Sequence, residues 1–312
     1  VYLHMKIAII GAGAMGCLFA CLLDNYEVTL YDVSPVAVER ISRDGILLQE
    51  PDGTESRHRI PIRFSGEGQE PQDLVILFVK DTAGEAALRA NLGLVGKDTV
   101  LLSLQNGMGN FEIMQRYVPA ERILLGTTRH NCVTRAPGVV YHSGAGETQI
   151  GSPTGDFATA EATAAVLSSD ASAVVACPDV KRLLWAKLML NVTVNPMTAL
   201  LDSTLGFAGE NPHAQSIIRM LVAEAVAVAA ADGVTFDAEA VISSIIQSAR
   251  ALATGRASMC QDIRAGRRTE IDFINGSVVR LGRQYGIPTP CHELMVDLIH
   301  AREDRNDTEK AE

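Results

Sequence analysis

Short apolar runs separated by helical stretches mark the first half of the chain. Residues 6–10 predict a strand, residues 17–23 a helix, and residues 27–31 a second strand. A strand, a glycine-rich turn, a helix and a strand within about 30 residues make a βαβ unit. Runs that are apolar throughout are typical of strands in a parallel sheet covered on both faces. Such strands are predicted at residues 74–79, 99–104 and 123–126, with an antiparallel edge within residues 138–151.

The second half of the chain has a helical period and almost no strand signal. Pro178 marks the change, and the last residues, 303–312, are almost all polar and are expected to fray. The pattern predicts an α/β sheet domain at residues 1–177, followed by an all-helical C-terminal domain at residues 178–312. The predicted helices of the second domain cover residues 181–193, 214–232, 237–252, 272–286 and 292–302.

Composition and charge narrow the class of protein. A chain of 312 residues suits about two domains, and 47% hydrophobic with 21% charged residues is typical of a globular protein. The formal net charge of −10 gives no electrostatic reason to bind nucleic acid or an anionic membrane. The six cysteines form no CxxC pair, so we expect no metal site. No apolar stretch reaches the roughly 18 residues of a membrane span, and residues 1–4 carry no targeting pattern, so we expect a cytoplasmic protein.

A glycine motif directly follows the first strand and opens the first helix. Gly11, Gly13 and Gly16 form GxGxxG, which is weak evidence alone but gains specificity in this context. Gly11 permits the tight turn, Gly13 lets backbone N–H groups approach a pyrophosphate, and Gly16 allows close packing of helix and strand. The first domain is therefore predicted to be a Rossmann-type dinucleotide-binding domain, unless the glycines form a turn without a ligand. The expected contacts are Gly11, Ala12, Gly13, Ala14, Met15 and Gly16.

Asp32 indicates which dinucleotide is bound. It ends the second strand, 21 residues after Gly11, where the adenosine ribose is expected. Its carboxylate can accept hydrogen bonds from both ribose hydroxyls but would repel the 2′-phosphate of NADP. No Arg or Lys follows Asp32 before Arg40. We therefore expect NAD(P)H as cofactor, with NADH favoured over NADPH; the alternative is that Asp32 only caps the helix that begins near Pro35.

Three polar residues share one face of the first helix of the second domain. Lys187, Asn191 and Asn195 are spaced four and four, so they lie along one side of a helix that is otherwise apolar. Asparagine is a poor surface helix former, which favours a site that uses the amides. Lysine can donate a proton to a developing alkoxide. The alternative is a solvated helix face with an asparagine at the helix end, ahead of Pro196.

A polar stretch farther along the chain offers two more candidates. Ser258 begins the sequence Ser-Met-Cys-Gln-Asp, and Glu270 lies within Thr-Glu-Ile-Asp at residues 269–272. The spacing from Thr269 to Asp272 fits a capping box that starts a helix. Glu270 would then lie in the first helical turn, where a carboxylate is favoured by the helix dipole without any catalytic role.

The chain resembles the ketopantoate reductase (2-dehydropantoate 2-reductase) family over essentially its whole length. This resemblance implies a Rossmann domain followed by a helical domain, with a 2-keto acid such as ketopantoate reduced to the D-2-hydroxy acid by NAD(P)H in the cleft. It also implies a place in pantothenate biosynthesis. The matching pieces are the glycine motif at residues 11–16, Val79-Lys80, residues 105–109, residues 184–187, Asn191, Asn195-Pro196, residues 258–262 and residues 269–272.

The resemblance gives each matching residue an expected role. Lys187 matches the catalytic lysine, which donates the proton as hydride reaches the keto carbon. Glu270 matches a glutamate that organises the site and contacts substrate or cofactor. Lys80 and Asn106 match residues beside the nicotinamide ribose and the substrate. The residues expected to hold the keto acid by its carboxylate and hydroxyl groups are Asn191, Asn195 and Ser258.

Two departures from the family pattern keep a related activity open. Family members that use NADPH commonly place Arg just after the second strand, where this chain has Asp32-Val33. Cys260 stands where a larger apolar or aromatic residue is common, which affects the substrate end of the site. An NAD-dependent D-2-hydroxyacid dehydrogenase, similar to D-mandelate dehydrogenase, is therefore the main alternative. A dinucleotide-binding protein without catalysis is a second alternative. The alanine-rich helices are compatible with a homodimer.

Overall fold

The structure, a computed structural model, describes residues 5–169 and 172–311 of the chain. It forms two compact units: unit 1 comprises Val1–Gln105 and Asn110–Leu183, and unit 2 comprises Asn106–Gly109 and Leu184–Glu312. Unit 1 is built on β-sheets and unit 2 on helices, which confirms the predicted fold class. The domain limits at residues 177 and 178 stay a prediction, and the expectation for residues 1–4 lies outside the described residues.

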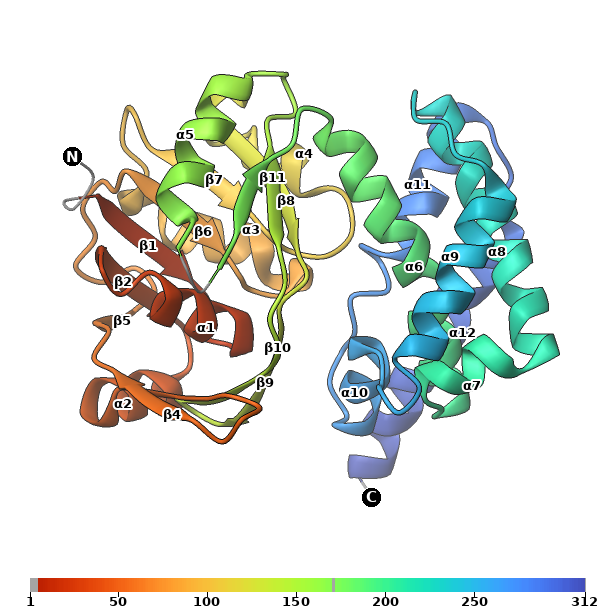
Figure 1. Cartoon of the computed structure of the whole chain (residues 1–312), viewed down its shortest axis with the longest axis horizontal. Helices are drawn as coiled ribbons and strands as arrows, with labels where there is room; N and C mark the ends of the chain where they lie inside the picture. Colours follow the sequence, from red (N-terminus) through yellow and green to blue (C-terminus); the bar gives the residue numbers. More distant parts are fainter. Residues whose placement is uncertain (1–4, 170–171, 312) are drawn as a thin grey trace. The chain divides into compact units, whose positions relative to one another are not determined.

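The main sheet of unit 1 has eight strands and is parallel except where β8 pairs with β11 (Figure 1). The predicted strands at residues 6–10, 27–31, 74–79, 99–104 and 123–126 all lie in this sheet, with small differences at their ends. In spatial order the strands are β12 (Val174–Ala176), β11 (Thr148–Gly151), β8 (Ile123–Thr128), β7 (Val100–Ser103), β6 (Leu74–Leu77), β1 (Lys6–Ile10), β2 (Glu27–Asp32) and β5 (Ile62–Phe64).

A second sheet of four strands corrects the predicted antiparallel edge. Its order is β4-β3-β10-β9, and β10 pairs antiparallel with β9 but parallel with β3. The predicted edge at residues 138–151 is therefore divided: β10 lies in the second sheet, while β11 lies in the main sheet between β8 and β12. The pattern missed this sheet because its β3–β10 pairing joins residues about ninety positions apart. The strands are β3 (Ile46–Gln49), β4 (Glu55–His58), β9 (Asn131–Ala136) and β10 (Val139–Gly144).

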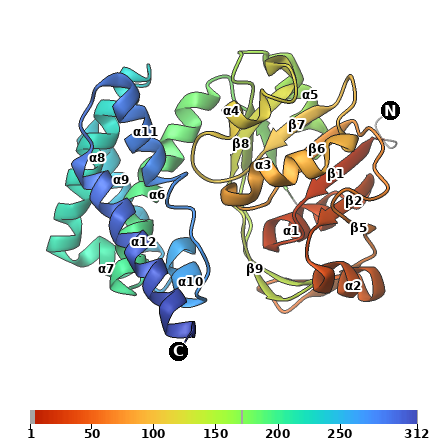
Figure 2. The same ribbon diagram turned by 180° about the vertical axis from the view of Figure 1, so that it is seen from behind.

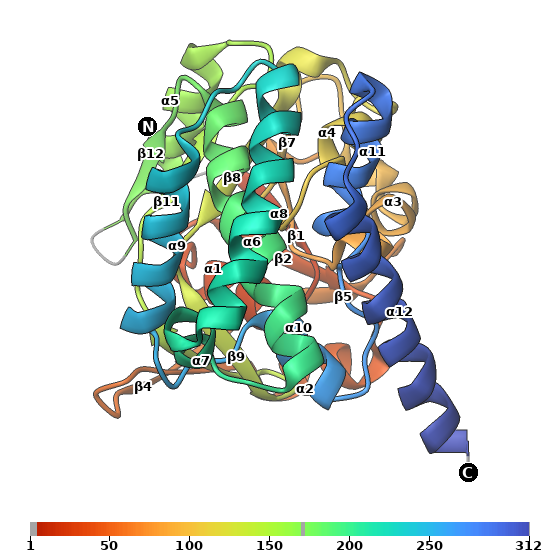
Figure 3. The same cartoon turned by 90° about the vertical axis from the view of Figure 1, so that its right-hand side faces the viewer.

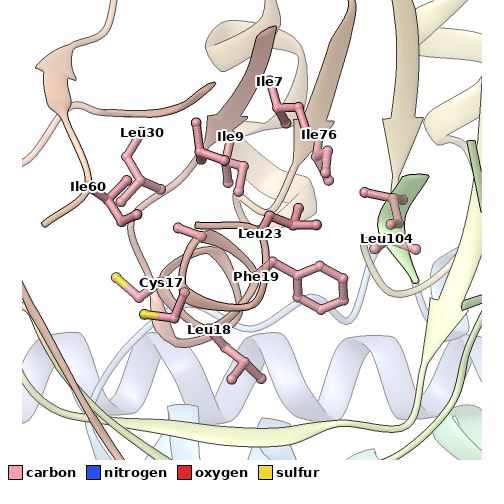
Figure 4. Close-up of a cluster of buried hydrophobic side chains, with 14 of the residues drawn as sticks. Ile7, Ile9, Cys17, Leu18, Phe19, Leu23, Leu30, Ile60, Ile76 and Leu104 are labelled. Atoms are coloured by element: carbon pink, nitrogen blue, oxygen red, sulfur yellow. The ribbon is translucent and has the colours of Figure 1, made fainter. Parts of the chain in front are cut away.

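Helix α1 (Ala14–Leu22) lies in the core of unit 1. It contacts β1 and β2 of the main sheet and β3, β9 and β10 of the second sheet, so both of its faces are covered. This explains why its sequence is apolar all round. In the close-up of Figure 4, Phe19 and Leu23 lie beside strand residues such as Ile76, while Leu18 points away from them. The helix that carries the glycine motif is thus held rigidly from two sides.

The other helices of unit 1 cover the main sheet and connect its strands. Figures 1 and 2 view this sheet from opposite sides: α1 and α5 lie in front of it in Figure 1, and α3 lies in front of it in Figure 2. These helices are α2 (Pro35–Asp44), α3 (Asp81–Ala90), α4 (Asn110–Met114) and α5 (Phe157–Leu167), with 3-10 turns at Leu92–Leu94 and Ala120–Arg122.

Unit 2 is a bundle of helices around Trp185, whose side chain is fully buried. Its indole Nε1 donates to Asp232 Oδ2 at 2.9 Å, and the Tyr285 hydroxyl donates to Asp232 Oδ1 at 2.6 Å. Figure 3 shows α8 with α9 on one side and α11 and α12 on the other. The helices are α6 (Val180–Leu201, which begins in unit 1), α7 (Leu205–Glu210), α8 (Pro212–Ala231), α9 (Ala238–Ala251), α10 (Ser258–Arg264), α11 (Asn275–Tyr285) and α12 (Pro290–Ala311).

Helix α8 is more apolar than the sequence analysis expected. It has 20 residues, and an 18-residue window within it has a mean hydropathy of 1.5, which is enough to cross a membrane by length and composition. However, Ile218, Leu221 and Val222 lie fully buried in the core of unit 2. Glu224 accepts the backbone N–H groups of the first turn of α12 at 2.9 and 3.1 Å. These are contacts of a core helix, so its composition alone is weak evidence for a membrane span.

The polar C-terminal stretch is helical, contrary to the expected fraying. Helix α12 continues to Ala311 because Glu303, which is buried, accepts the Thr269 backbone N–H at 2.7 Å and an Arg268 N–H at 3.1 Å. Asn306 donates to the Ile263 carbonyl at 2.9 Å. Polar residues here bind other segments of unit 2 instead of facing water only, which the local composition could not reveal.

Candidate functional site

The glycine motif adopts the geometry that close backbone packing requires. Gly11 has a φ of 106°, and a Cβ placed on it would lie 2.9 Å from the backbone of Phe78 and Val79. A Cβ on Gly16 would lie 1.8 Å from the Gly11 carbonyl oxygen. The packing reasons for glycine at both positions are confirmed, since any larger residue would push α1 away from the first strand.

Gly13 differs from its two neighbours in the motif. It is the N-cap residue of α1 and has extended backbone angles, and a Cβ on it would meet nothing within 4 Å. Packing therefore does not require glycine here, but a ligand close to the backbone would. The first turn of α1 contains no acidic residue that would compete for its N–H groups. This helix start fits the pyrophosphate of a dinucleotide.

Asp32 holds the glycine loop and leaves the capping of α2 to another residue. Its two carboxylate oxygens accept the backbone N–H groups of Ala12 at 2.6 Å and Ser34 at 2.7 Å. The N-cap of α2 is Ser34, whose Oγ accepts the Ala37 N–H at 3.3 Å. The alternative that Asp32 only caps this helix is therefore wrong. A carboxylate oxygen can accept more than one hydrogen bond, so the ribose hydroxyls remain possible donors.

Strand β5 brings residues to Asp32 that the local sequence could not show. Phe64 pairs with Asp32, and Arg63 pairs with Tyr31, in the parallel register of β2 and β5. The Ser65 backbone N–H donates to the Asp32 carbonyl at 3.0 Å. These residues are neighbours of Tyr31 and Asp32 through strand pairing, which the local sequence around Asp32 could not reveal.

Lys80 lies at the same edge of the sheet as the glycine loop. Strands β1 and β6 are parallel neighbours, so the residues after them, Gly11 and Val79-Lys80, lie close together. Lys80 is half-buried and is the N-cap residue of α3. The Gln105 side-chain amide donates to the Val79 carbonyl at 2.8 Å and thereby fixes this segment. The structure therefore brings Lys80 together with the glycine motif in unit 1.

The predicted polar face of α6 lies on a longer helix than expected. Lys187 and Asn191 are half-buried, and Asn195 is buried with 6% of its surface exposed. The helix continues through Pro196 to Leu201, so the prediction of a helix end ahead of Pro196 is wrong. The alternative of a solvated face is also wrong for Asn195, because that residue lies inside unit 2.

A distant side chain explains how α6 tolerates a proline. Pro196 has no N–H to donate to the Val192 carbonyl, four residues earlier. The Asn275 side-chain amide donates to that carbonyl instead, at 2.9 Å. Asn275 also contacts His292 Nδ1 at 3.1 Å, and His292 Nε2 lies 3.0 Å from the Leu221 carbonyl. Burial lowers the pKa of His292, so the neutral ring accepts from Asn275 and donates to the carbonyl.

Asn106 and Glu270 meet in unit 2, although 164 positions separate them in sequence. The Asn106 side-chain amide donates to Glu270 Oε2 at 3.3 Å. The loop Asn106–Gly109 belongs to unit 2, because the Met108 N–H donates to the Phe273 carbonyl at 3.0 Å. Gly107 has a φ of 79°, and a Cβ on it would lie 2.2 Å from that same carbonyl oxygen. This loop therefore requires glycine to bring Asn106 to Glu270.

The segment that carries Glu270 is not the start of a helix. Helix α11 begins only at Asn275, so the predicted capping box at residues 269–272 is wrong. Thr269 has other partners: its N–H donates to Glu303, and its Oγ1 accepts the Ile271 N–H at 3.3 Å. Without a helix start, the helix dipole does not explain Glu270, which leaves its contact with Asn106 as the relevant observation.

Ser258 and Cys260 both lie on α10 but in different surroundings. Ser258 is exposed at the first residue of the helix. Cys260 is buried in the core of unit 2, with its Sγ 3.7 Å from Asp202 Oδ1. Among the described residues, no group of three or more His, Cys, Asp or Glu side chains could hold a metal ion.

Comparisons with known proteins give one consistent result. The family model described as ketopantoate reductase PanE/ApbA matches residues 7–155, and the model of its C-terminal part matches residues 179–303. The chain is 34% identical to the 2-dehydropantoate 2-reductase of Halobacterium salinarum, over 95% of this chain and 98% of that protein. It is 32% identical to the 2-dehydropantoate 2-reductase of Vibrio cholerae, over 96% of this chain and 98% of that protein.

Two solved structures agree with this result. D-mandelate dehydrogenase in a ternary structure with NADH and anilino(oxo)acetate has a TM-score of 0.93 and 32% identity, over 97% of this chain and 100% of that one. A PanE/ApbA family ketopantoate reductase from Ralstonia eutropha has a TM-score of 0.88 and 30% identity, over 97% of this chain and 100% of that one. The chain therefore belongs to the ketopantoate reductase family, whose members use a nicotinamide cofactor for oxidoreductase chemistry.

Proposed function

We propose that this protein reduces a 2-keto acid to the D-2-hydroxy acid, with ketopantoate as the substrate. The observation that carries this proposal is one face of α6, where the half-buried Lys187 and Asn191 and the buried Asn195 follow one another at helical spacing. A lysine beside two amides offers one proton donor and several hydrogen-bond donors to a small anion that contains a carbonyl group. Ketopantoate and its product pantoate have this chemistry.

The residues of this chain hold the substrate and move one proton. When bound on the helix start of α1, the nicotinamide cofactor supplies the hydride. Lys187 Nζ donates a proton to the keto oxygen as that oxygen gains charge, and solvent then returns a proton to the amine. Asn191, Asn195 and Ser258 hold the carboxylate and hydroxyl groups of the substrate. Glu270, with Asn106, orients the substrate and the nicotinamide ribose, and Lys80 contacts the cofactor.

One buried and one partly buried hydrogen bond around Glu270 support its place in this scheme. Glu303 fixes the segment before Glu270 by accepting the Thr269 N–H, and the Asn106 amide fixes the Glu270 carboxylate itself. A side chain whose neighbouring backbone and carboxylate are both fixed can keep the geometry that catalysis needs. We therefore propose Lys187 and Glu270 as the catalytic residues.

We also propose that Asp32 makes NADH the favoured cofactor. Its carboxylate occupies the end of β2, and the 2′-phosphate of NADPH would approach it at close range. We expect Asp32→Asn to raise kcat/KM for NADPH by about ten-fold, equal to ~1.4 kcal/mol, while kcat/KM for NADH falls. Steady-state kinetics with both cofactors measure this. Asp52→Asn is a matched control, since Asp52 also accepts a backbone N–H but lies in the β3–β4 turn. A wild-type preference for NADPH would exclude this role.

A D-2-hydroxyacid dehydrogenase is the second candidate function. The observation that favours it is the TM-score of 0.93 to D-mandelate dehydrogenase, whose complexes contain NADH. The same lysine and asparagines can serve either substrate, because both substrates carry a 2-keto acid group. The side chain of the substrate decides between the two candidates.

A substrate panel separates the two candidates. Ketopantoate, phenylglyoxylate and 2-ketoisocaproate are each supplied with NADH or NADPH. The reaction rate is measured as the decrease in the absorbance of the reduced cofactor. We expect the highest kcat/KM with ketopantoate and NADH. Turnover of phenylglyoxylate without turnover of ketopantoate would overturn the first candidate in favour of the second, and no turnover of any 2-keto acid would overturn both.

Three further proposals concern the whole protein. We propose domain limits at residues 1–177 and 178–312, a homodimer formed through the alanine-rich helices, and a cytoplasmic location without nucleic-acid or membrane partners. Size-exclusion chromatography with light scattering measures the mass of the assembly, and a monomer would contradict the homodimer.

A further inference from the structure

A concave site on unit 1 is lined by residues outside the glycine motif. It is a cavity of about 360 Å³ between the C-terminal end of α2, the paired strands β3 and β4, and the turn that joins β9 to β10. Small-molecule sites commonly have volumes of about 300–1,000 Å³, so this space suits a small ligand. The lining residues are Arg40, Asp44, Gly45, Leu47, Arg57, Arg59, Pro137, Gly138 and Val139.

Three arginine side chains line this cavity. Arg57 lies in β4, Arg59 follows the last residue of that strand, and both line the cavity. Arg57 Nη1 donates to the Asp44 carbonyl at 2.8 Å, and Arg59 Nη1 donates to the Arg43 carbonyl at 2.8 Å. Each of these bonds fixes a guanidinium with one N–H, while most of the N–H donors of the group serve other partners or solvent. Arg40 joins them from α2.

The charge of the cavity is positive in a chain whose net charge is −10. Asp44 is the one carboxylate among the lining residues, and Arg43, which is outside the lining, donates to both of its oxygens at 3.0 Å. The Arg43 guanidinium, with smaller contributions from Arg40 and Arg57, lowers the pKa of Asp44. Arg40 also pairs with Asp44, at 3.5 Å. Three lining arginines still outnumber the one lining carboxylate, so positive charge remains for a ligand.

Two glycines allow the walls of the cavity to approach one another. Gly45 has a φ of 74°, and a Cβ on it would lie 2.6 Å from the His58 carbonyl oxygen. Gly138 has a φ of 72°, and a Cβ on it would lie 3.0 Å from the Ile41 side chain. The Leu47 N–H donates to the Gly138 carbonyl at 2.8 Å and joins the two segments. The backbone segments that line the cavity beside the arginines are therefore tightly packed against one another.

We propose that this cavity is a second anion-binding site, which takes a small polyanion bearing phosphate or carboxylate groups. Planar guanidinium groups bind such anions through paired, charge-assisted hydrogen bonds. The site is separate from the proposed dinucleotide site, because neither the glycine motif at residues 11–16 nor Asp32 lines it. A ligand in this cavity would therefore not occupy the proposed dinucleotide site.

The arginines also have a purely structural interpretation, which the experiment must separate from binding. Positive side chains at the C-terminal end of a helix stabilise its unpaired carbonyl groups, and Arg57 and Arg59 do this for α2. If this were their only role, the variants would lose stability but the wild type would bind no polyanion. Binding and stability must therefore be measured on the same samples.

Calorimetric titration of the full chain tests the proposal. Pyrophosphate and citrate are titrated separately into protein saturated with NADH, so that the helix start of α1 is already occupied. We expect saturable binding of at least one of them in the wild type, and the preferred probe distinguishes phosphate from carboxylate ligands. In the double variant Arg57→Gln/Arg59→Gln, we expect affinity to fall by about ten-fold or more.

Two further variants keep the result interpretable. Arg40→Gln removes a lining cation whose one ion pair among the described residues is with Asp44, at 3.5 Å, so it tests binding if the double variant unfolds. Arg122→Gln is the control, because Arg122 also donates to backbone carbonyls of unit 1 but lies outside the cavity. The proposal is overturned if the wild type binds neither probe at millimolar concentration. It is also overturned if the Arg40 variant binds as tightly as the wild type and the Arg122 variant.

Discussion

The glycine loop of unit 1 and the polar face of α6 in unit 2 are built in opposite ways. The loop offers backbone N–H groups, and two of its positions, Gly11 and Gly16, have no space for a Cβ. The α6 face offers side chains, and their positions depend on contacts from other helices. The proline within α6, for example, relies on Asn275, 79 positions farther along the chain.

This difference separates cofactor binding from chemistry in the proposed enzyme. A backbone site tolerates changes in most side chains but no added Cβ at its packed glycines. A side-chain site loses its chemistry when one group is removed, while the fold persists. Changes in the two regions should therefore affect different measured quantities, and the predictions below use this contrast.

The largest expected effect follows removal of the proposed proton donor. We expect Lys187→Ala to lower kcat by about 10²–10⁴-fold, which is the usual contribution of general acid catalysis, because the keto oxygen then lacks its proton source. The dissociation constant for NADH should stay within about two-fold of the wild type. Steady-state kinetics and fluorescence titration measure the two quantities. Lys181→Ala, on the exposed first turn of the same helix, is the control and should keep its turnover.

The next effect compares a glycine of the loop that has space for a Cβ, Gly13, with one that has none, Gly16. We expect Gly13→Ala to keep the thermal stability of the wild type, since a Cβ there meets no protein atom within 4 Å, but to weaken NADH binding by about ten-fold because the pyrophosphate occupies that space. Gly16→Ala should instead lower stability by about 1–3 kcal/mol, because its Cβ would overlap the Gly11 carbonyl. Thermal denaturation and NADH titration check both. Tight NADH binding by Gly13→Ala would contradict the proposed position of the cofactor.

A loss of stability similar to that of Gly16→Ala should follow when the contact that supports α6 is removed. We expect Asn275→Leu to lower the free energy of unfolding by about 1–3 kcal/mol, because the Val192 carbonyl and His292 Nδ1 lose a buried donor. Denaturant unfolding measures this change. Asn306→Ala removes a similar amide-to-carbonyl bond near the surface, and we expect a smaller loss there. Equal losses in the two variants would show that burial of the Asn275 contact is unimportant.

The smallest effect is a pH dependence of stability at the segment that carries Glu270. Burial disfavours the charged ring of His300, but the hydrogen bonds that its ring N–H groups donate to Asp272 and Glu303 outweigh this and raise its pKa. A raised pKa gives stability that is fully present below the unfolded value near ~6.5 and is lost as pH rises through the folded value. We therefore expect His300→Gln to destabilise the protein more at pH ~5.5 than at pH ~8, by a few tenths of a kcal/mol.

The lowered pKa of His292 predicts the opposite trend within the same unit. A depressed histidine pKa removes stability as pH falls from about 6.5 toward the folded value, because the unfolded state binds the proton more readily. The pH dependence of wild-type stability contains the contributions of both His300 and His292, so only variants separate them.

His213→Gln, on the exposed first turn of α8, serves as the control for His300→Gln. A pH-independent loss in His300→Gln would contradict the role of its two carboxylate partners.

The sequence predicted the glycine loop because all of its requirements are local. A strand, three glycines and a helix within a short stretch define the backbone path, and Asp32 follows at the end of the next strand. The shared face of Lys187, Asn191 and Asn195 was also predictable, since helical spacing alone places these residues on one side.

Long-range contacts set the parts that the sequence did not predict. The second sheet pairs β3 with β10, and no local pattern specifies that register. The sequence predicted that Glu270 lies in the first turn of a helix. In the structure, Glu303 of α12 binds the preceding residue, Thr269, and the segment around Glu270 is not helical. The polar stretch at residues 303–312 was expected to fray because its partner in the structure is distant: Arg268, which donates to Glu303, lies 35 positions earlier. In each case a side chain distant in sequence replaces a local signal.

The most direct test compares Gly13→Ala and Lys187→Ala in one experiment that measures both NADH affinity and turnover at saturating NADH. We expect a crossed result: the glycine variant binds NADH about ten-fold more weakly but keeps most of its kcat, while the lysine variant binds NADH normally but loses about 10²–10⁴-fold in kcat. If the lysine variant keeps its turnover, or if each variant changes both quantities together, the division between a backbone cofactor site and a side-chain catalytic site is contradicted.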